Sequence, residues 1–384
     1  MTFSLQNKKV RAFVIQSIVL LVVLFLAKYF SGNVIENLQR LGITSGFDFL
    51  ESRAGYDLYS PFLAYTADSS HMEAFYVGLL NTLVISVMGV FLATVVGFLL
   101  GVLRLSDNWL VAKTVYCIVE FTRNVPVLIW IVIWYFGVFL QLPSPRKAIN
   151  IYDMIFVSNR GLYLPSPEFI AGSSAILIAF IGAIVIKMIY TRRAKVIQDA
   201  TGKQSPVFLV SVGIILILPL IAYFLAGQPI EWSIPALKGF NFKGGMALKP
   251  EFVSLLMGLS VYTACNIAEI VRAGILSVSG GQGEAARALS LTKSQTMKMI
   301  IIPQALRVII PPLNSQFMNL AKNSSLAIAV GYVDVVATIG GVTLNQTGQA
   351  LECIAIVMVT YLILSLIIST VMNFVNRKVQ IVER

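Results

Sequence analysis

The chain has 384 residues, of which 57% are hydrophobic and 12% are charged, and its mean hydropathy is +0.82. Soluble domains carry about 25% charged residues, so this composition excludes an ordinary soluble protein and indicates an integral membrane protein. The net charge of +11 does not indicate nucleic-acid binding, because the basic residues cluster at the ends of apolar segments, as in proteins that follow the positive-inside rule.

Eight apolar segments are long enough to cross a bilayer as helices. A helix needs about 20 residues for this, and it satisfies its own backbone hydrogen bonds in hydrocarbon. The first segment is followed by no small-residue cleavage site, so we interpret it as a retained helix rather than a signal peptide. The predicted spans are 12–30, 74–103, 114–140, 172–190, 207–226, 252–277, 308–328 and 350–375.

The lysines and arginines between the spans predict the orientation. Alternate connections differ in basic content, and the richer set is expected to be cytoplasmic. With an even number of spans, both termini then lie in the cytoplasm. The richer set is Lys8, Lys9, Arg11, Arg104, Lys113, Arg192, Arg193, Lys195, Lys203, Arg287, Lys293, Lys298, Arg307, Arg377, Lys378 and Arg384. The poorer set is Arg40, Arg53, Arg146, Lys147, Arg160, Lys238, Lys243 and Lys249.

Three connections, 31–73, 141–171 and 227–250, fall on the opposite side. The first carries acidic side chains between aromatics, the second is rich in proline, and the third ends in GGMALKP just before a span. All are too short for a catalytic domain, but they can form a cap that meets a soluble outer protein. For 141–171, a loop that merely closes the helices is an equal alternative.

The sequence contains no recognisable enzyme or metal constellation. Cys117, Cys265 and Cys353 lie far apart in apolar segments, and the single histidine, His71, lies in a polar loop without a partner for metal or triad chemistry. There is no GxxxxGK[ST] phosphate loop, so we do not expect this chain to hydrolyse ATP. HExxH and GxSxG motifs are also missing, and we predict no catalytic residue and no metal site.

One polar stretch, 278–307, interrupts the apolar pattern with the sequence VSGGQGEAARALSLTKSQTMKMIIIPQALR. Glu284 begins an EAA triplet, Ser290 follows six residues after Glu284, and Pro303 lies near the end of the stretch. Ala285, Ala288 and Leu289 share one helical face, which predicts a short helix that can seat closely in a groove. A surface helix without a partner is the alternative.

This spacing resembles the EAA loop of ATP-binding-cassette (ABC) importer permeases, whose pattern is EAA, three residues, Gly, nine residues, I-x-L-P. In that family the loop forms a short cytoplasmic helix that sits in a cleft of the ATPase. Here Ser290 replaces the Gly and Ile302 replaces the Leu. The serine matters if the turn needs a positive φ, which glycine adopts most readily. The resemblance implies ATPase coupling through Gly281, Gly283, Glu284, Ala285, Ala286, Ser290 and Pro303, with the glycines letting the chain turn into the loop.

From residue 74 onward the chain is similar to the polar amino-acid group of these permeases. The matching segments are 78–89, 120–126, 244–252, 268–275, the EAA loop and 303–327. An extra N-terminal helix with an outer loop at 1–73, and an inserted region at about 141–245 within a permease domain at 74–384, resemble the larger (Q-type) permease subunit of general L-amino-acid transporters. The implied fold is an all-α integral membrane protein with about eight transmembrane helices, of the type I importer permease fold, with a cytoplasmic coupling helix at 278–307.

The resemblance also implies partners and a location. It implies a second homologous permease subunit, an ABC ATPase dimer that binds ATP and magnesium, and a periplasmic protein that binds the L-amino-acid substrate. This chain itself is expected to bind no cofactor and no nucleic acid. Its place is the lipid bilayer of a bacterial inner membrane, which it crosses several times.

Ionisable pairs within predicted spans are candidates for the substrate path or gate. Glu120 with Arg123, and Glu269 with Arg272, are each spaced i, i+3. Charges in spans are costly and usually line a cavity or pair with one another. A structural pair near the membrane surface is the alternative for both.

A second candidate for the substrate path interrupts the seventh span. Lys322, Asn323 and Ser324 follow Pro311 and Pro312, and prolines free backbone groups from the helical ladder. Polar, irregular backbone at membrane depth is tolerated beside water or protein, and it commonly presents donors to a substrate carboxylate. Polar contacts that merely hold helices together are the alternative.

Two other functions stay open at this stage. An ion-coupled secondary transporter or channel for small polar solutes requires carboxylates within the membrane, and Glu352, near the start of the last span, is the main one. A membrane scaffold needs neither a polar path nor the EAA spacing.

Overall fold

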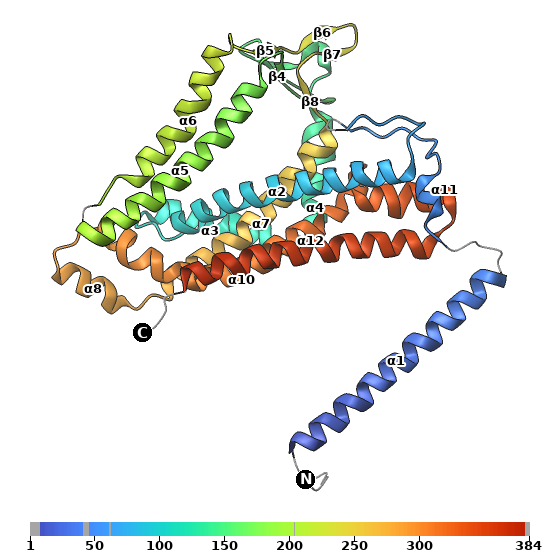
Figure 1. Cartoon of the computed structure of the whole chain (residues 1–384), viewed down its shortest axis with the longest axis horizontal. Coiled ribbons are helices and arrows are strands. Elements are labelled where there is room, and N and C mark those ends of the chain that lie inside the picture. The colour runs from blue at the N-terminus through green and yellow to red at the C-terminus, as the bar shows by residue number, and fades with distance from the viewer. Residues whose placement is uncertain (1–7, 41–45, 61–62, 203, 381–384) are drawn as a thin grey trace. The chain divides into compact units, whose positions relative to one another are not determined.

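The computed structural model describes residues 8–40, 46–60, 63–202 and 204–380 (Figure 1). Lys203 and Arg384 of the richer basic set, and both chain ends whose cytoplasmic side was predicted, lie outside these residues. The chain divides into two compact units, which are described separately below. Unit 1 is Met1–Val132 with Leu255–Arg384, and unit 2 is Ile133–Ser254.

Seven helical stretches among the described residues are long and apolar enough to cross a membrane, and a bent pair raises the number to eight. This confirms the prediction of about eight spans. The bent pair is α3 (Trp109–Asn124) with Val127–Gln141, which turns through 105° at Pro126. The other stretches are Arg11–Val34 within α1 (Lys8–Arg40), α2 (His71–Leu103), α5 (Ser174–Thr201), α6 (Val207–Leu225), α7 (Pro250–Leu276), Lys293–Val330, and α12 (Ala350–Val379).

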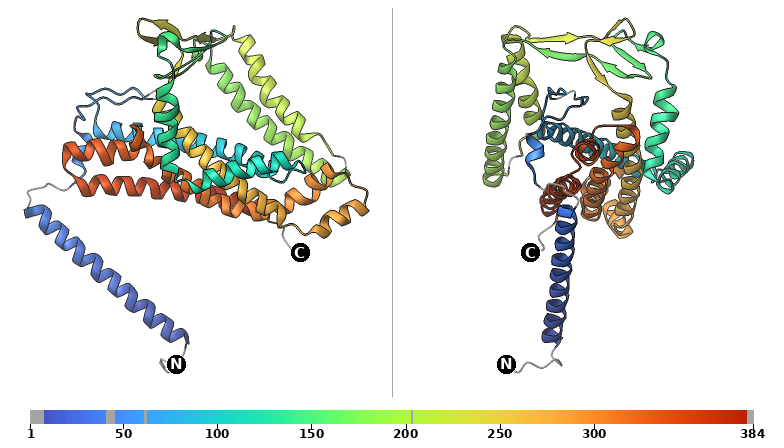
Figure 2. Two further views of the ribbon diagram at one scale, coloured as in Figure 1. Left: turned by 180° about the vertical axis from the view of Figure 1, so that it is seen from behind. Right: turned by 90° about the vertical axis from the view of Figure 1, so that its right-hand side faces the viewer.

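Unit 1 is built from long helices that lie side by side. Helices α2, α10 (Ile302–Asn323) and α12 run together in both Figures 1 and 2. Small residues allow α2 and α7 to approach closely: an added Cβ at Gly97 or Gly101 would come within 2.7 Å of Ile267 or Val271. This Gly-x-x-x-Gly spacing is a recurrent helix-packing device in membranes, where dispersion contacts replace the hydrophobic effect between helices.

The connection from α10 to α12 is irregular. After α10 the chain forms a 3₁₀ helix, η6 (Ser324–Val330), and passes Gly331 at φ +76°. It continues as a π-helix, η7 (Val336–Thr343), and one turn of α-helix, α11 (Leu344–Thr347). Pro311 and Pro312 lie inside α10, so the helix continues through the prolines and the regular α-helix ends at Asn323.

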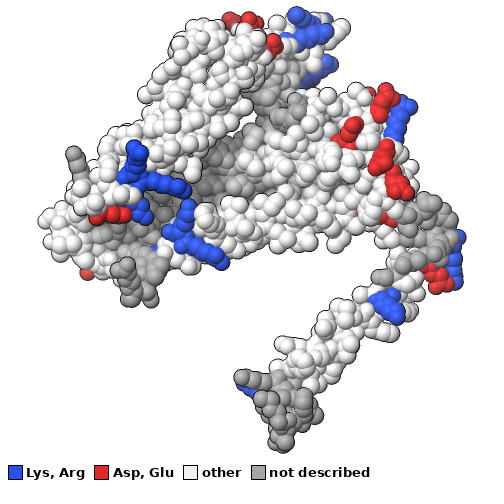
Figure 3. Space-filling model, viewed as in Figure 1, with Lys and Arg blue, Asp and Glu red and all other residues white. Residues whose placement is uncertain are grey.

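Residues 46–70, called the outer segment after their predicted location, pack against the rest of unit 1. Its short helix η1 (Asp48–Glu51) buries Phe49 and Leu50 against Ile339 and Cys353. Burial raises the pKa of the Tyr56 phenol, whose oxygen lies 2.9 Å from Thr343 Oγ1. Acidic side chains gather over this segment in Figure 3, and those that are exposed here or at the start of α2 are Asp48, Glu51, Asp57, Asp68 and Glu73.

The position predicted for His71 in a polar loop is wrong. Ser70 caps α2 in a reciprocal capping box with Glu73, so the helix begins at His71. The His71 ring is 2% exposed, and its Nδ1 lies 3.1 Å from Thr343 Oγ1. The histidine therefore contributes to the packing between the outer segment and η7.

Unit 2 combines a helical hairpin, α5 and α6, with three small antiparallel sheets. The mostly helical fold class is confirmed, but the sequence analysis did not anticipate these strands. Phe242 holds the sheet region together, with its ring centroid 4.5 Å from that of Phe156 and 4.7 Å from that of Tyr163. The strands are β1 (Ile149–Ile151), β2 (Ile155–Ser158), β3 (Gly161–Leu164) and β8 (Met246–Leu248) in one sheet, β4 (Ser166–Phe169) with β5 (Ile230–Ser233), and β6 (Ala236–Lys238) with β7 (Asn241–Lys243).

Candidate functional site

The polar stretch between α7 and α10 contains a short helix, α8 (Gly280–Ala288), at the predicted position. Ala286 is completely buried on the other face of the helix. Glu284, Ala285 and Ala288 are exposed, and the next residue, Leu289, is 74% exposed. Within the described residues, this leaves a small, apolar helix face uncovered beside a carboxylate.

The glycines of this stretch behave differently from the expectation. Gly281 and Gly283 do not form the turn into the loop, because the helix already begins at Gly280 after Ser279. Gly281 is exposed, and an added Cβ at Gly283 would meet nothing within 4 Å. Because they are glycines, the first turn of α8 carries little side-chain bulk.

The turn that ends α8 requires a positive φ. Ser290 has φ +56°, its N–H donates to Arg287 O at 2.9 Å, and Leu291 N–H donates to Ala286 O at 3.1 Å. These two bonds form a Schellman motif, in which glycine usually occupies the left-handed position. The bend expected from the EAA pattern is therefore made with serine, at a conformational cost that glycine would avoid.

A second cap follows directly and leads into α10. Thr292 and Gln295 form a reciprocal capping box at the start of α9 (Lys293–Thr296). A π-helical turn, η5 (Met297–Ile301), then continues into α10, where Pro303 occupies the first turn. The stretch that contains α8 and α9 is thus joined to the 22-residue helix α10 without an intervening loop.

The two predicted ion pairs are brought together by a third basic residue, Arg104, at the end of α2. Arg104 Nη2 donates to Glu120 at 2.9 Å, and Nη1 donates to Glu269. Arg272 also binds Glu269, through Nη2 at 2.7 Å and Nε at 3.1 Å, while Arg123 lies 3.7 Å from Glu120. Arg104 is 8% exposed, so it forms the buried centre of the cluster.

The residues predicted as the second candidate for the substrate path, at the end of α10, lie in different environments. Lys322 is exposed, whereas Ser324 is completely buried. Ser324 Oγ donates to Ala321 O at 2.7 Å and lies 3.2 Å from Tyr361 Oη. Asn323, the last residue of α10, is half-buried. Among the described residues, Lys322 forms no ion pair with Glu120 or Glu269, the carboxylates of the Arg104 cluster.

A buried carboxylate that the sequence analysis missed lies beside this break. Asp334 is 0% exposed; its Oδ2 accepts from Tyr361 Oη at 3.0 Å and its Oδ1 accepts from Ala337 N–H at 2.8 Å. Thr82 of α2 accepts from the N–H of the next residue, Val335, at 3.2 Å. As the acidic residue between the seventh and eighth predicted spans, Asp334 could have been singled out from the sequence.

Known proteins place the chain in a family. The model for the binding-protein-dependent transport system inner membrane component matches residues 205–381. The chain is 47% identical over 383 residues to an amino-acid ABC transporter permease protein of Escherichia coli, YhdX, covering 100% of this chain and 98% of that protein. It is 43% identical to the general L-amino acid transport system permease protein AapQ of Rhizobium johnstonii, covering 99% of this chain and 95% of that protein.

A third relative is the glutamate/glutamine/aspartate/asparagine transport system permease protein BztB of Rhodobacter capsulatus. It is 40% identical, covering 98% of this chain and 96% of that protein. These three similarities extend over nearly the whole chain, including its N-terminal helix and the inserted region. None of them favours an ion-coupled secondary transporter. The chain belongs to the amino-acid ABC transporter permeases.

Proposed function

We propose that this chain forms half of a path for L-amino acids across a bacterial inner membrane and couples it to ATP hydrolysis through α8. The observation that carries the proposal is the uncovered face of α8. Ala285, Ala288 and Leu289 are exposed, whereas Ala286 anchors the helix from the other side. A short helix with a small-residue face, fixed at its base, suits insertion into a groove of a partner.

The partners follow from this proposal. A separate ABC ATPase dimer binds ATP and magnesium, and its closure moves α8. A second homologous permease completes the path, and a periplasmic amino-acid-binding protein delivers the substrate. Both termini of this chain lie in the cytoplasm. The two permease subunits then alternate between inward-open and outward-open states, with ATP supplying the free-energy difference between them.

Coupling requires that motion at α8 reach the membrane interior. The two caps hold the turn between α8 and α9, and α10 runs directly from this turn to the break at Ser324. Helices are stiff over such lengths, so displacement of α8 is transmitted along α10 toward the break at Ser324. Lys322, Asn323 and Ser324 lie at the far end of this lever, where we place the substrate path.

The exposed acidic residues of the outer segment suit a contact with the binding protein. Because Phe49 and Leu50 anchor the segment, deletion of 31–73 would also remove packing. Residues 41–45 and 61–62 lie outside the described part of this segment. Charge reversal of Asp48 and Asp57 tests the contact without loss of the packing of Phe49 and Leu50. We expect uptake to fall at low substrate concentration. Wild-type uptake by the double variant would exclude these two residues as docking contacts.

The central test is ATP-dependent amino-acid uptake in proteoliposomes containing all partners, with Glu284→Lys in α8. We expect uptake to be lost, while expression is normal and association with the ATPase is weakened. Asp199→Lys is the matched control, because Asp199 is exposed near the end of α5 and outside the coupling stretch. Unchanged uptake and association in Glu284→Lys would show that α8 is not the coupling element.

A further inference from the structure

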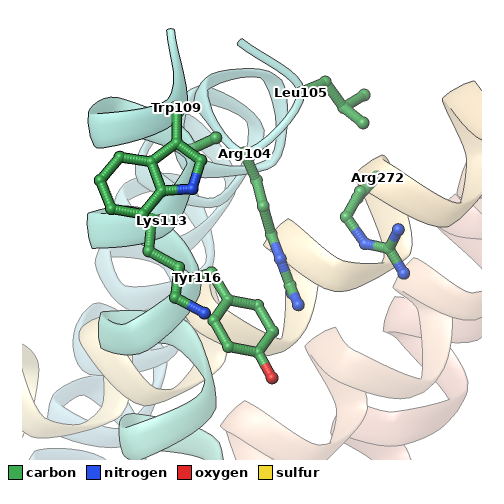
Figure 4. A pocket seen from close by; sticks show the side chains of 7 residues that line it. Arg104, Leu105, Trp109, Lys113, Tyr116 and Arg272 are labelled. Atoms are coloured by element: carbon green, nitrogen blue, oxygen red, sulfur yellow. The ribbon is translucent and has the colours of Figure 1, made fainter. Parts of the chain in front are cut away.

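A cavity of about 460 Å³ opens beside the Arg104 cluster (Figure 4). It lies in unit 1, between the end of α2, the first turns of α3, and α7. Figure 4 shows that the side chains of Arg104 and Lys113 extend toward Tyr116, with Arg272 on the far side of Arg104. The lining residues are Arg104, Leu105, Trp109, Ala112, Lys113, Tyr116 and Arg272.

Positive charge is in excess around this cavity. Each glutamate of the cluster is already shared by two arginines. Lys113 has no ion pair among the described residues, and Asp107, in the same α2–α3 connection, is engaged with Lys293. Four cations and two carboxylates give an excess of two positive charges; they are Arg104, Lys113, Arg123 and Arg272, with Glu120 and Glu269.

An aromatic ring holds two of these cations together. The Arg104 guanidinium and the Lys113 ammonium each lie 4.9 Å from the centroid of the Tyr116 ring. Cation–π contacts of this kind bring the two like charges close without neutralising them. Within the described residues, Arg272 uses Nε and Nη2 on Glu269, which leaves Nη1 as a further donor. The cavity therefore presents several donors and surplus charge before any ligand arrives.

The rim of the cavity has the chemistry of a membrane surface. Trp109 is 74% exposed, and tryptophan favours the headgroup level because it combines an apolar ring with an N–H donor. Leu105 and Ala112 add apolar lining. The connection 104–113 belongs to the basic set predicted to be cytoplasmic, and basic pockets between membrane helices on that side suit acidic headgroups.

We propose that this cavity binds a phosphate-bearing anion, namely the headgroup phosphate of an anionic phospholipid in the adjacent leaflet. A phosphate offers several acceptor oxygens to guanidinium and ammonium donors and balances the surplus charge. The apolar lining then meets the glycerol and upper acyl chains. This site is additional to the transport path and to the coupling helix. Free inorganic phosphate is the other source of the same chemistry.

The test uses Trp109 as a reporter in the full-length chain, purified with its accompanying subunits and placed in nanodiscs. The difference in emission between wild type and Trp109→Phe isolates the signal of this tryptophan from the other three. We expect brominated phosphatidylglycerol to quench that signal more than brominated phosphatidylcholine. Lys113→Gln should weaken the preference about fivefold, as expected for the loss of one lysine near an anionic surface. Lys195→Gln, a change at another exposed lysine of the richer set, should leave the preference unchanged.

Titration with inorganic phosphate distinguishes the two sources. Quenching by phosphatidylglycerol that persists in phosphate assigns the cavity to the lipid headgroup. Quenching that phosphate reverses, or a Trp109 response to phosphate in phosphatidylcholine alone, assigns it to a phosphate anion that also arrives from solution. Equal quenching by the two lipids, with no response to phosphate, would overturn the proposal. A preference that survives Lys113→Gln would equally contradict it.

Discussion

The two ends of α10 are attached to unit 1 in opposite ways. At its N-terminal end, the chain enters from an exposed stretch that is held by a backbone cap at Ser290 and a side-chain capping box at Thr292. At its C-terminal end, the chain continues into a buried network in which Tyr361 Oη donates to Asp334 and lies 3.2 Å from Ser324 Oγ. One attachment is local and accessible to water, whereas the other depends on side chains from three separate parts of the chain.

This difference follows from where water can reach. In the exposed stretch, a lost cap exposes a backbone group that water can satisfy, so the loss is modest. In the buried network, an unsatisfied polar group keeps its full desolvation penalty. The comparison therefore predicts that α10 has a firm end at Ser324, here its inner end, and an adjustable end at Pro303, here its outer end. Such an arrangement suits the coupling role that we propose for α8 and α10.

The largest effect is expected at the inner end, for Asp334→Ala. The change leaves the Tyr361 hydroxyl and the Ala337 N–H without their acceptor, and we expect a loss of about 3 kcal/mol in unfolding free energy. Thermal unfolding of the purified chain in detergent measures it as a lower midpoint. Asp334→Asn is the matched control, because it keeps an acceptor for Ala337 and should lose less. An unchanged midpoint for Asp334→Ala would falsify the idea of a firm inner end.

Tyr361→Phe tests the same network from α12 with a smaller change. It removes one hydroxyl, which donates to Asp334 and contacts Ser324, and we expect a loss of about 1.5 kcal/mol. Combined with Asp334→Ala, the two losses should be less than additive, because both remove one shared bond. Tyr76→Phe is the control, since Tyr76 is 51% exposed on α2. Fully additive losses would show that the two residues act independently.

The parts of this molecule that were predictable from sequence are those with a local signal. Hydropathy located the spans, because each needs a run of about 20 apolar residues. The EAA spacing located α8, and the serine in the glycine position indicated where a positive φ would be needed. The positions of Ser290 and Pro303 follow from neighbours only a few residues away.

The parts that were not predictable depend on distant partners. Arg104 is 165 positions from Glu269. In the sequence it is only one more basic residue at the end of a span, and nothing local indicates that it lies between the two ion pairs. Asp334 meets Tyr361 through the irregular path of η6 and η7, which hydropathy does not describe. The strands of unit 2 have three or four residues each, too few for a reliable alternating pattern.

At the outer end, Thr292→Ala removes the side-chain acceptor of the capping box. The Gln295 N–H then loses its bond to Thr292 Oγ1, and we expect a local loss of about 1 kcal/mol. Hydrogen exchange of the amides in Lys293–Thr296 should accelerate about fivefold, while the unfolding midpoint of the whole chain stays close to wild type. Thr292→Ser keeps the hydroxyl and serves as control. If the midpoint fell as far as in Asp334→Ala, the two ends would not differ.

The smallest effect is a gain, for Ser290→Gly. Ser290 occupies the left-handed region at φ +56°, where glycine has no Cβ penalty, but glycine also loses more chain entropy on folding. The net stabilisation of the turn is therefore expected to be only about 0.5 kcal/mol. Slower exchange of the Leu291 amide, which donates to Ala286 O, measures it. Ser290→Ala keeps the Cβ penalty and should not slow exchange. If alanine and glycine act alike, then strain at this φ does not contribute, and the adjustable character of the outer end comes from its exposure to water alone.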